Sequence, residues 1–217
     1  MDYLVPVIVF FLLMVIFLIN HSVVTIIEKN SSPDRLIERV AQIDDAGFLR
    51  QFNAFKLWAE QNGFVHDGLF LAHMAAKGAS LQCGAWWNAQ QSTWVLMYFY
   101  KGKHFYDWVT KLTDGGVLST SSSKDALILP SPAHYYVQAF ANVSFDTLLQ
   151  KHQASINLLK NQAGKAIDPQ KTDVIQEMKA ALATQAVYIK TLPFWQHKGL
   201  FWYVYHRNFL VNKPITI

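Results

Sequence analysis

Hydrophobic residues form an unbroken run at the start of the chain, before any periodic pattern begins. No polar side chain occurs from Leu4 to Ile19, and after a polar patch at residues 20–22 the run resumes up to Ile27. A helix over Leu4–Ile19 would rise about 24 Å, less than the ~30 Å hydrocarbon core of a bilayer, whereas Val5–Ile27 would rise about 34 Å. The pattern predicts a transmembrane anchor over residues 1–27.

The flanks of this run indicate how the anchor is oriented. It has neither the positively charged start nor the Ala-x-Ala-like site of a cleaved signal peptide. Lys29, Arg35 and Arg39 follow the run and no basic residue precedes it. The positive-inside rule then predicts a single-pass plasma-membrane protein with its N-terminus outside and its domain in the cytoplasm.

Residues 28–63 carry helical patterns and are expected to be juxtamembrane helices. Ser32 followed by Pro33 is typical of a helix start. Two sets of apolar residues then recur at helical spacing: Leu36, Val40 and Ile43, and Phe48, Phe52, Phe55 and Ala59. Asn62-Gly63 is a typical helix end. The connection from the membrane to the domain is therefore expected to be helical.

From Phe64 to about residue 141 the apolar period becomes two, which is typical of strands. Five strands are expected at 69–74, 81–87, 94–100, 105–112 and 117–121, and two more at 126–129 and 135–140. Turn sequences such as Lys77-Gly78 and Asp114-Gly115-Gly116 join them closely. Short connections favour hairpins, so an antiparallel meander of about five to seven strands is predicted.

Helical spacing returns after the strands. Ser144 is a plausible N-cap for a helix through Leu159, and Thr172 begins a second helix that ends near Ile189. The order anchor, helices, antiparallel sheet, helices predicts an α+β fold, with its domain over residues 64–217.

Charge and aromatic content single out the C-terminal segment. Residues 28–146 hold ten Lys and Arg against eleven Asp and Glu, whereas residues 147–217 hold nine against three. In segment 194–217 basic residues alternate with aromatic rings, which suits an anionic bilayer interface. The expected membrane-interface residues are Lys198, Trp202, Tyr203, Tyr205 and Arg207. The alternative is that this segment forms a final strand or helix of the core. Binding to single-stranded nucleic acid would also suit such residues, but it requires more assumptions for a domain that is already tethered to a membrane.

Aromatic residues are concentrated on three of the predicted strands. Because side chains alternate along a strand, both faces of the sheet must carry large apolar groups. One face can pack on helices, and the other needs a second helix layer, a partner, an apolar ligand or the membrane. The expected partner or ligand face comprises Trp86, Trp87, Trp94, Tyr98, Tyr100 and Trp108.

No motif in the sequence names a reaction. Metal-binding spacings such as His-x-x-x-His and Cys-x-x-Cys are absent, so neither a metal nor a cofactor is expected. Cys83 lies in an alternating strand and His152 on an apolar helix face, and both are expected in the core. The Ser119–Ser123 region could supply a nucleophile with His134 or His152, but an edge strand running into a polar loop is favoured.

Three functions remain open. The leading hypothesis is a membrane-anchored binding or scaffolding protein without catalysis of its own, such as an accessory subunit of a membrane complex. Its expected partners are the lipid bilayer and a membrane protein. The second is a domain that binds a lipid or other apolar ligand between sheet and helices. The third is a membrane-tethered hydrolase that uses the Ser119–Ser123 region.

Overall fold

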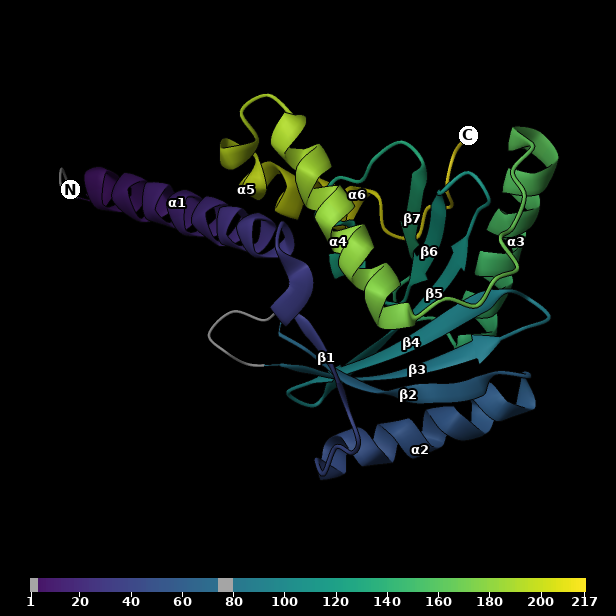
Figure 1. Cartoon of the computed structure of the whole chain (residues 1–217). Coiled ribbons are helices and arrows are strands. Elements are labelled where there is room, and N and C mark those ends of the chain that lie inside the picture. Colours follow the sequence, from purple (N-terminus) through teal and green to yellow (C-terminus); the bar gives the residue numbers. More distant parts are fainter. Residues whose placement is uncertain (1–3, 74–79) are drawn as a thin grey trace.

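The computed structural model describes residues 4–73 and 80–217 of the chain, and its architecture is α+β (Figure 1). Residues 1–3 and 74–79 lie outside the described part, together with the expected turn Lys77-Gly78 and the end of the first expected strand at Met74. One seven-stranded sheet forms the centre, with strands in the order of the sequence. The predicted fold class, an N-terminal apolar helix followed by a mostly antiparallel sheet with flanking helices, is confirmed.

The strands of the sheet are β1 (Ile37–Val40), β2 (Val65–Ala72), β3 (Leu81–Asn88), β4 (Thr93–Tyr100), β5 (Lys103–Lys111), β6 (Val117–Ser121) and β7 (Tyr135–Ala139). Neighbours are antiparallel up to β6, but β7 pairs with β6 in parallel. The expected all-antiparallel meander is therefore wrong at its last strand. A parallel pair needs a connection of about a dozen residues, which segment 122–134 provides.

The long helices are α1 (Leu4–Asn30), α2 (Ala46–Gln61), α3 (Phe145–Ala163) and α4 (Val174–Thr191). The predicted helices at 48–59, 144–159 and 172–189 are confirmed. Side-chain oxygens of Asp45, Ser144 and Asp173 accept backbone N–H groups in the first turns of α2, α3 and α4. Towards the C-terminus, α5 (Gly199–Phe201), a π-turn at Trp202–His206 and α6 (Arg207–Phe209) form one continuous helical segment.

Two expected elements differ in the structure. The predicted helix through Leu36–Ile43 is instead a 3-10 turn, η1 (Pro33–Arg35), followed by β1. Ile37 packs on the α4 side of the sheet and Val40 on the α2 side, as residues three apart on a strand must. The expected strand at 126–129 is not formed: residues 126 and 127 belong to a 3-10 helix, η3 (Lys124–Leu127), and residues 128 and 129 form a bend. Ser123 caps η3 by accepting the N–H of Asp125.

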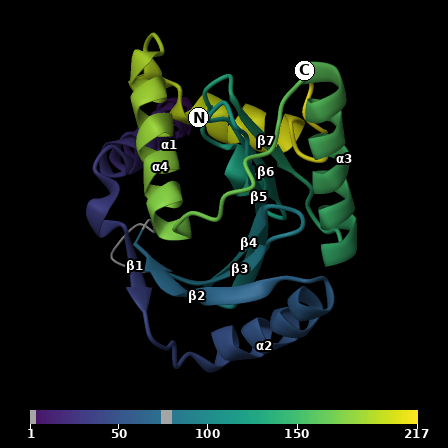
Figure 2. The same cartoon turned by 45° about the vertical axis from the view of Figure 1, so that its right-hand side comes forward.

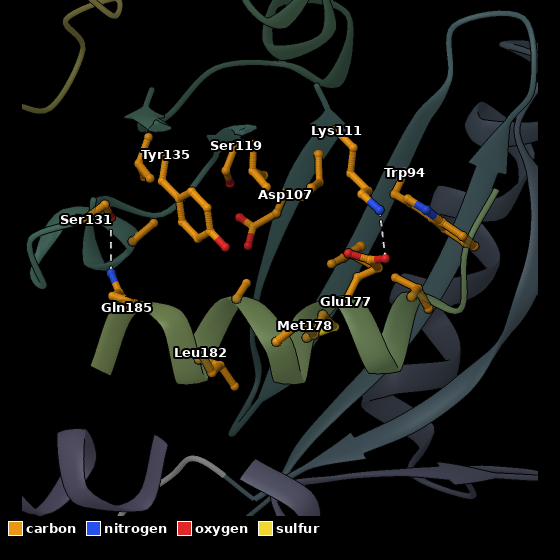
Figure 3. A pocket seen from close by; sticks show the side chains of 18 of the residues that line it. Trp94, Asp107, Lys111, Ser119, Ser131, Tyr135, Glu177, Met178, Leu182 and Gln185 are labelled. Carbon is orange, nitrogen blue, oxygen red and sulfur yellow. Dashed lines mark hydrogen bonds and ion pairs between the residues drawn. The ribbon is translucent and has the colours of Figure 1, made fainter. Parts of the chain in front are cut away.

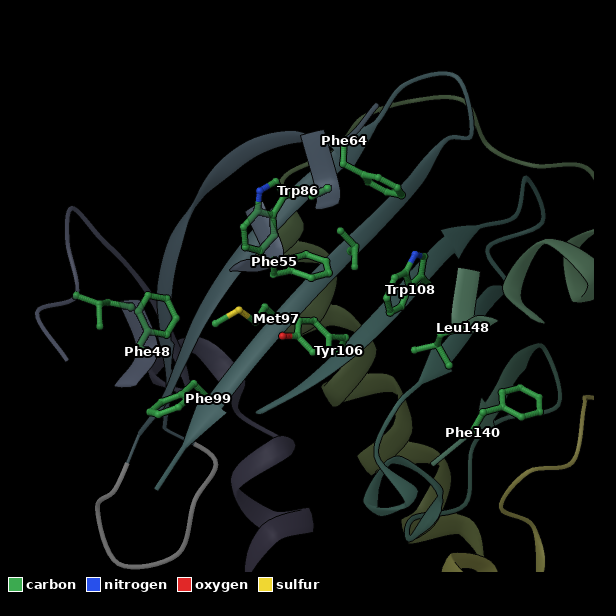
Figure 4. Packing of buried hydrophobic residues seen from close by; sticks show 13 residues of the cluster. Phe48, Phe55, Phe64, Trp86, Met97, Phe99, Tyr106, Trp108, Phe140 and Leu148 are labelled. Carbon is green, nitrogen blue, oxygen red and sulfur yellow. The ribbon is translucent and has the colours of Figure 1, made fainter. Parts of the chain in front are cut away.

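The chain's own helices cover both faces of the sheet (Figures 1 and 2). On one face Phe48 and Phe55 of α2 and Leu148 of α3 pack on Trp86 and Trp108, as Figure 4 shows. On the other face the residues under α4 are Trp87, Trp94 and Tyr98, which pack with Val174 and Ile175. This double cover explains why aromatic residues occur at consecutive positions of the central strands.

Helix α1 has a free part and a packed part. The side chains from Leu4 to Leu18 are mostly exposed, and α1 is long and apolar enough by length and composition to span a membrane. Val23 and Ile27, further along, are buried against Ala186 and Ile189 of α4. The expected span Val5–Ile27 is thus divided, and its last turns belong to the folded domain.

The C-terminal end of the described chain returns to the sheet. The backbone N–H of Ile215 donates a buried hydrogen bond of 3.1 Å to Oε1 of Gln138 on β7. The same oxygen accepts the hydroxyl of Ser155 from α3 at 3.0 Å. Ile215 therefore links the C-terminal segment to both β7 and α3.

Candidate ligand-binding site

A cavity of about 410 Å³ lies between α4 and the sheet face formed by β4 to β7 (Figure 3). Alternating strand residues line one side, because every second side chain points to the same face. They include Leu96, Tyr98, Asp107, Val109, Lys111, Val117, Ser119, Tyr135 and Val137. Helix α4 lines the other side with residues at helical spacing, including Glu177, Met178, Leu182 and Gln185.

Strand register brings the lining residues into rows. Asp107 is paired with Leu96 on one side and with Ser121 on the other. In the next row, Ser119 lies between Val109 and Val137. Most of this sheet wall is apolar, and the hydroxyl of Ser119 and the carboxyl of Asp107 lie at defined positions along it.

Polar contacts mark both ends of the α4 wall. Near its start, Lys111 Nζ and Glu177 Oε1 form an ion pair of 2.8 Å. Further along, Gln185 Nε2 donates to Ser131 Oγ at 3.1 Å. Eight helical residues separate Glu177 from Gln185, or about 12 Å of helix. Asn30, the last residue of α1, also lines the cavity, so the site adjoins the base of the N-terminal helix.

Asp107 is the distinctive group in the wall. Its Oδ1 atom is buried and has no hydrogen-bond partner within residues 4–73 and 80–217. Burial raises the pKa of Asp107 to about 6, against the opposing effect of the Ser121 and Tyr98 hydroxyls. A second hollow of about 590 Å³, lined by Tyr100, also includes Tyr98 and Asp107. The carboxyl thus lies where the two spaces meet, and can accept a hydrogen bond from a guest molecule in either.

The opposite face of the sheet holds a buried polar network around His152. Thr93 donates its hydroxyl proton to the carbonyl of Gln91, so Thr110 supplies the proton for the 2.7 Å contact between the two threonines. Nε2 of His152 must then donate to Thr110 at 2.9 Å, and Nδ1 accepts from Thr120 at 2.8 Å. Burial lowers the pKa of His152 to about 3, which matches this neutral ring. His152 is a core histidine.

The serine-rich region lies partly at the cavity and partly in the turn after β6. Ser119 lines the cavity. The hydroxyls of Ser121, Ser122 and Ser123 accept backbone N–H groups. In residues 4–73 and 80–217, no hydrogen bond joins the hydroxyls of these three serines to a histidine. Thr120 of the same region does bond to His152, but on the other face of the sheet, within the buried threonine network.

The expected partner or ligand face is split by the structure. Trp86 and Trp108 are fully buried beneath α2 and α3. Trp94 and Tyr98 line the main cavity, and Tyr100 lines the second hollow. Trp87 packs against Trp94 with ring centroids 5.0 Å apart. Three of the six residues therefore face a space that a ligand could enter.

The expected membrane-interface residues also differ in exposure. Trp202 is 3% exposed and packs among α1 and α4 residues. Tyr203 and Tyr205 are exposed, and Lys198 is half-buried. Arg207 pairs with Asp125 and lies over the Tyr203 ring, 5.1 Å from its centroid.

Other candidate chemistry is structural. Cys83 is buried, and burial raises the pKa of its thiol well above the usual value. Within the described ranges no three His, Cys, Asp or Glu side chains converge as a metal site would require. Comparison with protein-family models, with curated proteins and with solved structures finds no match.

Sequence reasoning did not identify Asp107 as a site residue. The signal was present in β5, where an acidic residue lies between Phe105 and Val109 on one face of an alternating strand. An ionisable group at an apolar position is an informative exception, since buried charges are rare unless they are paired or functional.

Proposed function

We propose that this is a single-pass membrane protein whose domain binds an amphiphilic small molecule in the cavity between α4 and the sheet. One observation carries the proposal: an apolar cavity of about 410 Å³ contains a buried carboxyl oxygen without a partner. Sites for small molecules are concave and mostly apolar, with a few polar groups that orient the ligand. The second of the functions expected from the sequence is thus the one that the geometry supports best.

The wall suggests the chemistry of the ligand. Leu96, Val109 and Met178 suit a hydrocarbon body, and Asp107 suits a group that donates hydrogen bonds. Because the pKa of Asp107 is about 6, its carboxyl is mainly ionised at neutral pH. A protonated amine on a hydrocarbon chain satisfies both requirements, and an anionic head group would be repelled.

Native mass spectrometry of the full chain, incubated with dodecylamine, dodecanol or dodecanoate, tests this proposal. We expect occupancy to fall in that order, and Leu182→Trp to abolish it by filling the cavity. Val187→Trp is the matched control, because Val187 is 62% exposed on the same helix. Asp107→Asn should remove the preference for the amine. Equal occupancy in the two tryptophan variants would contradict the site.

Membrane attachment through α1 belongs to the same proposal. The apolar side chains from Leu4 to Leu18 are exposed, which supports a lipid environment for this part of α1. The charge asymmetry supports a plasma-membrane protein with its domain in the cytoplasm. In sealed right-side-out vesicles, external protease should leave the domain intact, and digestion from that side would reverse the orientation.

The accessory-subunit hypothesis stays a prediction. A membrane partner would copurify with the tagged full-length chain in mild detergent, whereas isolation as a lone monomer would count against it. The hydrolase hypothesis requires a positioned base, and the serine hydroxyls beyond Ser119 are engaged with backbone groups instead.

A further inference from the structure

The helical segment 199–209 presents a row of aromatic rings to the outside. Phe201, Tyr205 and Phe209 follow one another at intervals of four residues, and adjacent ring centroids lie 5.3 Å apart. Their exposed fractions are 55%, 45% and 56%. We name these three residues the aromatic ladder. Such a row is unusual on a surface that meets only water.

The other side of this segment is fixed to the folded domain. Trp202 is buried in a cluster with Val23 and Ile27 of α1. His206 is half-buried and Arg207 pairs with Asp125 of η3, so the ladder cannot turn inward without breaking these contacts. One face of the segment thus belongs to the core, and the ladder forms the opposite face.

Helix α1 sets the height of the ladder relative to a bilayer. The N–H of Leu200 donates to Oδ1 of Asn20 at 3.1 Å. Gly199 permits this approach, because a Cβ there would lie 3.0 Å from Val23 and 2.9 Å from the Asn20 oxygen. Figure 1 shows α5 beside α1 at the end of the domain from which α1 projects. Asn20, in the polar patch at residues 20–22, therefore has a structural role, because it joins α1 to α5.

The length of α1 before this contact matches the edge of a bilayer. From Leu4 to Asn20 the helix rises about 24 Å, which is somewhat less than the ~30 Å hydrocarbon core. With the free end of α1 at the far boundary, Asn20 and α5 come to lie within about 6 Å of the near boundary. A ladder of Phe and Tyr at this level would sit where aromatic side chains are enriched in membrane proteins.

The charge of the C-terminal elements also suits a position at the bilayer surface. Residues 178–217 contain no Asp or Glu and five basic residues, Lys179, Lys190, Lys198, Arg207 and Lys213. Lys190 and Arg207 pair with Glu28 and Asp125. The excess of positive charge on the C-terminal elements favours anionic lipid head groups over a neutral surface.

We infer that the aromatic ladder is a second membrane contact, which inserts into the head-group region of an anionic leaflet beside α1 and holds the domain against the bilayer. This inference rests on the proposed anchoring by α1. It changes the membrane interface expected from the sequence. Tyr205 remains in the interface, Phe201 and Phe209 are added to it, and Trp202 is assigned to the core instead.

Depth-dependent fluorescence quenching tests the inference on the full chain in liposomes of phosphatidylcholine and phosphatidylglycerol. A thiol-reactive environment-sensitive probe is placed at Phe201→Cys, Tyr205→Cys or Phe209→Cys. The native Cys83 is buried and should stay unlabelled. Phe10→Cys reports on the anchor, and Leu57→Cys, 65% exposed on α2, reports on the domain surface away from α1. Lipids with a spin-label quencher near the head group or deep in the acyl chain give the depth.

Lipid quenchers should strongly reduce emission at all three ladder positions, most with the head-group quencher, and leave Leu57→Cys unchanged. Phe10→Cys should respond most to the deep quencher. Quenching at Phe10→Cys without quenching at the ladder would overturn the inference and leave the anchor intact. No quenching at Phe10→Cys would reject the anchor itself. A ladder protected from aqueous iodide but not quenched by lipid would identify a protein partner and also overturn the inference.

Discussion

Asp107 is an acidic residue whose burial makes its charge costly for the fold. The pKa is raised to about 6 from the usual 3.8, so between these values the folded chain holds a proton that the unfolded chain has released. The contribution of Asp107 to stability is therefore most favourable at low pH and is lost as the pH rises through about 6. The ionised carboxyl costs at most about 3 kcal/mol above that pH.

Replacing Asp107 with Asn should stabilise the protein at neutral pH. We expect the free energy of unfolding at pH 7.5 to rise by about 1–3 kcal/mol, because the amide removes the buried charge with little change of shape. At pH 4.5, which is below the folded pKa but still above 3.8, the gain should shrink to about one third of its value at pH 7.5. Denaturant unfolding at both pH values measures the change in the free energy of unfolding. Asp44→Asn, at an exposed residue, is the control. A gain of the same size at both values would contradict the role of charge.

His152 should give the opposite pH dependence. Its pKa in the fold is about 3, so below about 6.5 only the unfolded chain takes up the proton and stability is lost as the pH falls. His152→Ala should cost roughly 2–4 kcal/mol at pH 7.5, since it opens a cavity and leaves buried threonine hydroxyls unpaired. The deficit relative to wild type should shrink by up to about 1.4 kcal/mol per pH unit below 6.5. A deficit that is constant between pH 7.5 and 5 would disprove this account.

At the scale of elements, the close contact of α5 with α1 depends on the absence of a side chain at Gly199. Gly199→Val would place carbon atoms within about 3 Å of Val23 and Asn20. Overpacking of this kind typically costs about 1–3 kcal/mol. We expect a matching loss in the free energy of unfolding of the full chain, while Leu57→Val, at a residue of α2 that is 65% exposed, changes it little. Equal stability of the two variants would show that α5 and α1 are not closely packed.

Local patterns predicted most elements because each depends on neighbours in sequence. Ser144 and the apolar spacing of α3 and α4 are of this kind, as is the alternation in β3 to β5. The spacing of Leu36, Val40 and Ile43 fits a helix as well as a strand. The segment becomes a strand because it pairs with β2, which is distant in sequence. The parallel placement of β7 likewise depends on where segment 122–134 leads, which no local spacing specifies.

The cavity was predictable only in outline. Alternation identified the aromatic residues of the sheet, but which of them a helix covers closely depends on the packing of α2 and α4 against it. Trp86 meets Phe55 of α2, with ring centroids 4.9 Å apart, whereas Tyr98 faces the space below α4. Asp107 of β5 and Glu177 of α4 are far apart in sequence, so no motif could place them around the same cavity.

At the scale of the whole molecule, α1 is both an anchor candidate and a part of the domain. Val23 and Ile27 are 6% and 0% exposed, and each such side chain contributes about 1.5–3 kcal/mol on burial. Removing residues 1–30 should therefore lower the melting temperature by roughly 10 °C. Removing only residues 1–18 should change it little, because those side chains are mostly exposed. Differential scanning fluorimetry of the two truncated proteins compares them, and equal melting temperatures would show that the base of α1 is dispensable.

The hydrogen bond from Ile215 to Gln138 bears on the order in which the protein is assembled during synthesis. The polar core behind β7 lacks one of its donors until residue 215 has left the ribosome, long after α1 has been synthesised. Until then, the side-chain oxygen of Gln138, between the sheet and α3, would lack the hydrogen bond from the N–H of Ile215. A nascent chain arrested shortly before residue 215 should accordingly be more sensitive to protease than one extended by a linker beyond it.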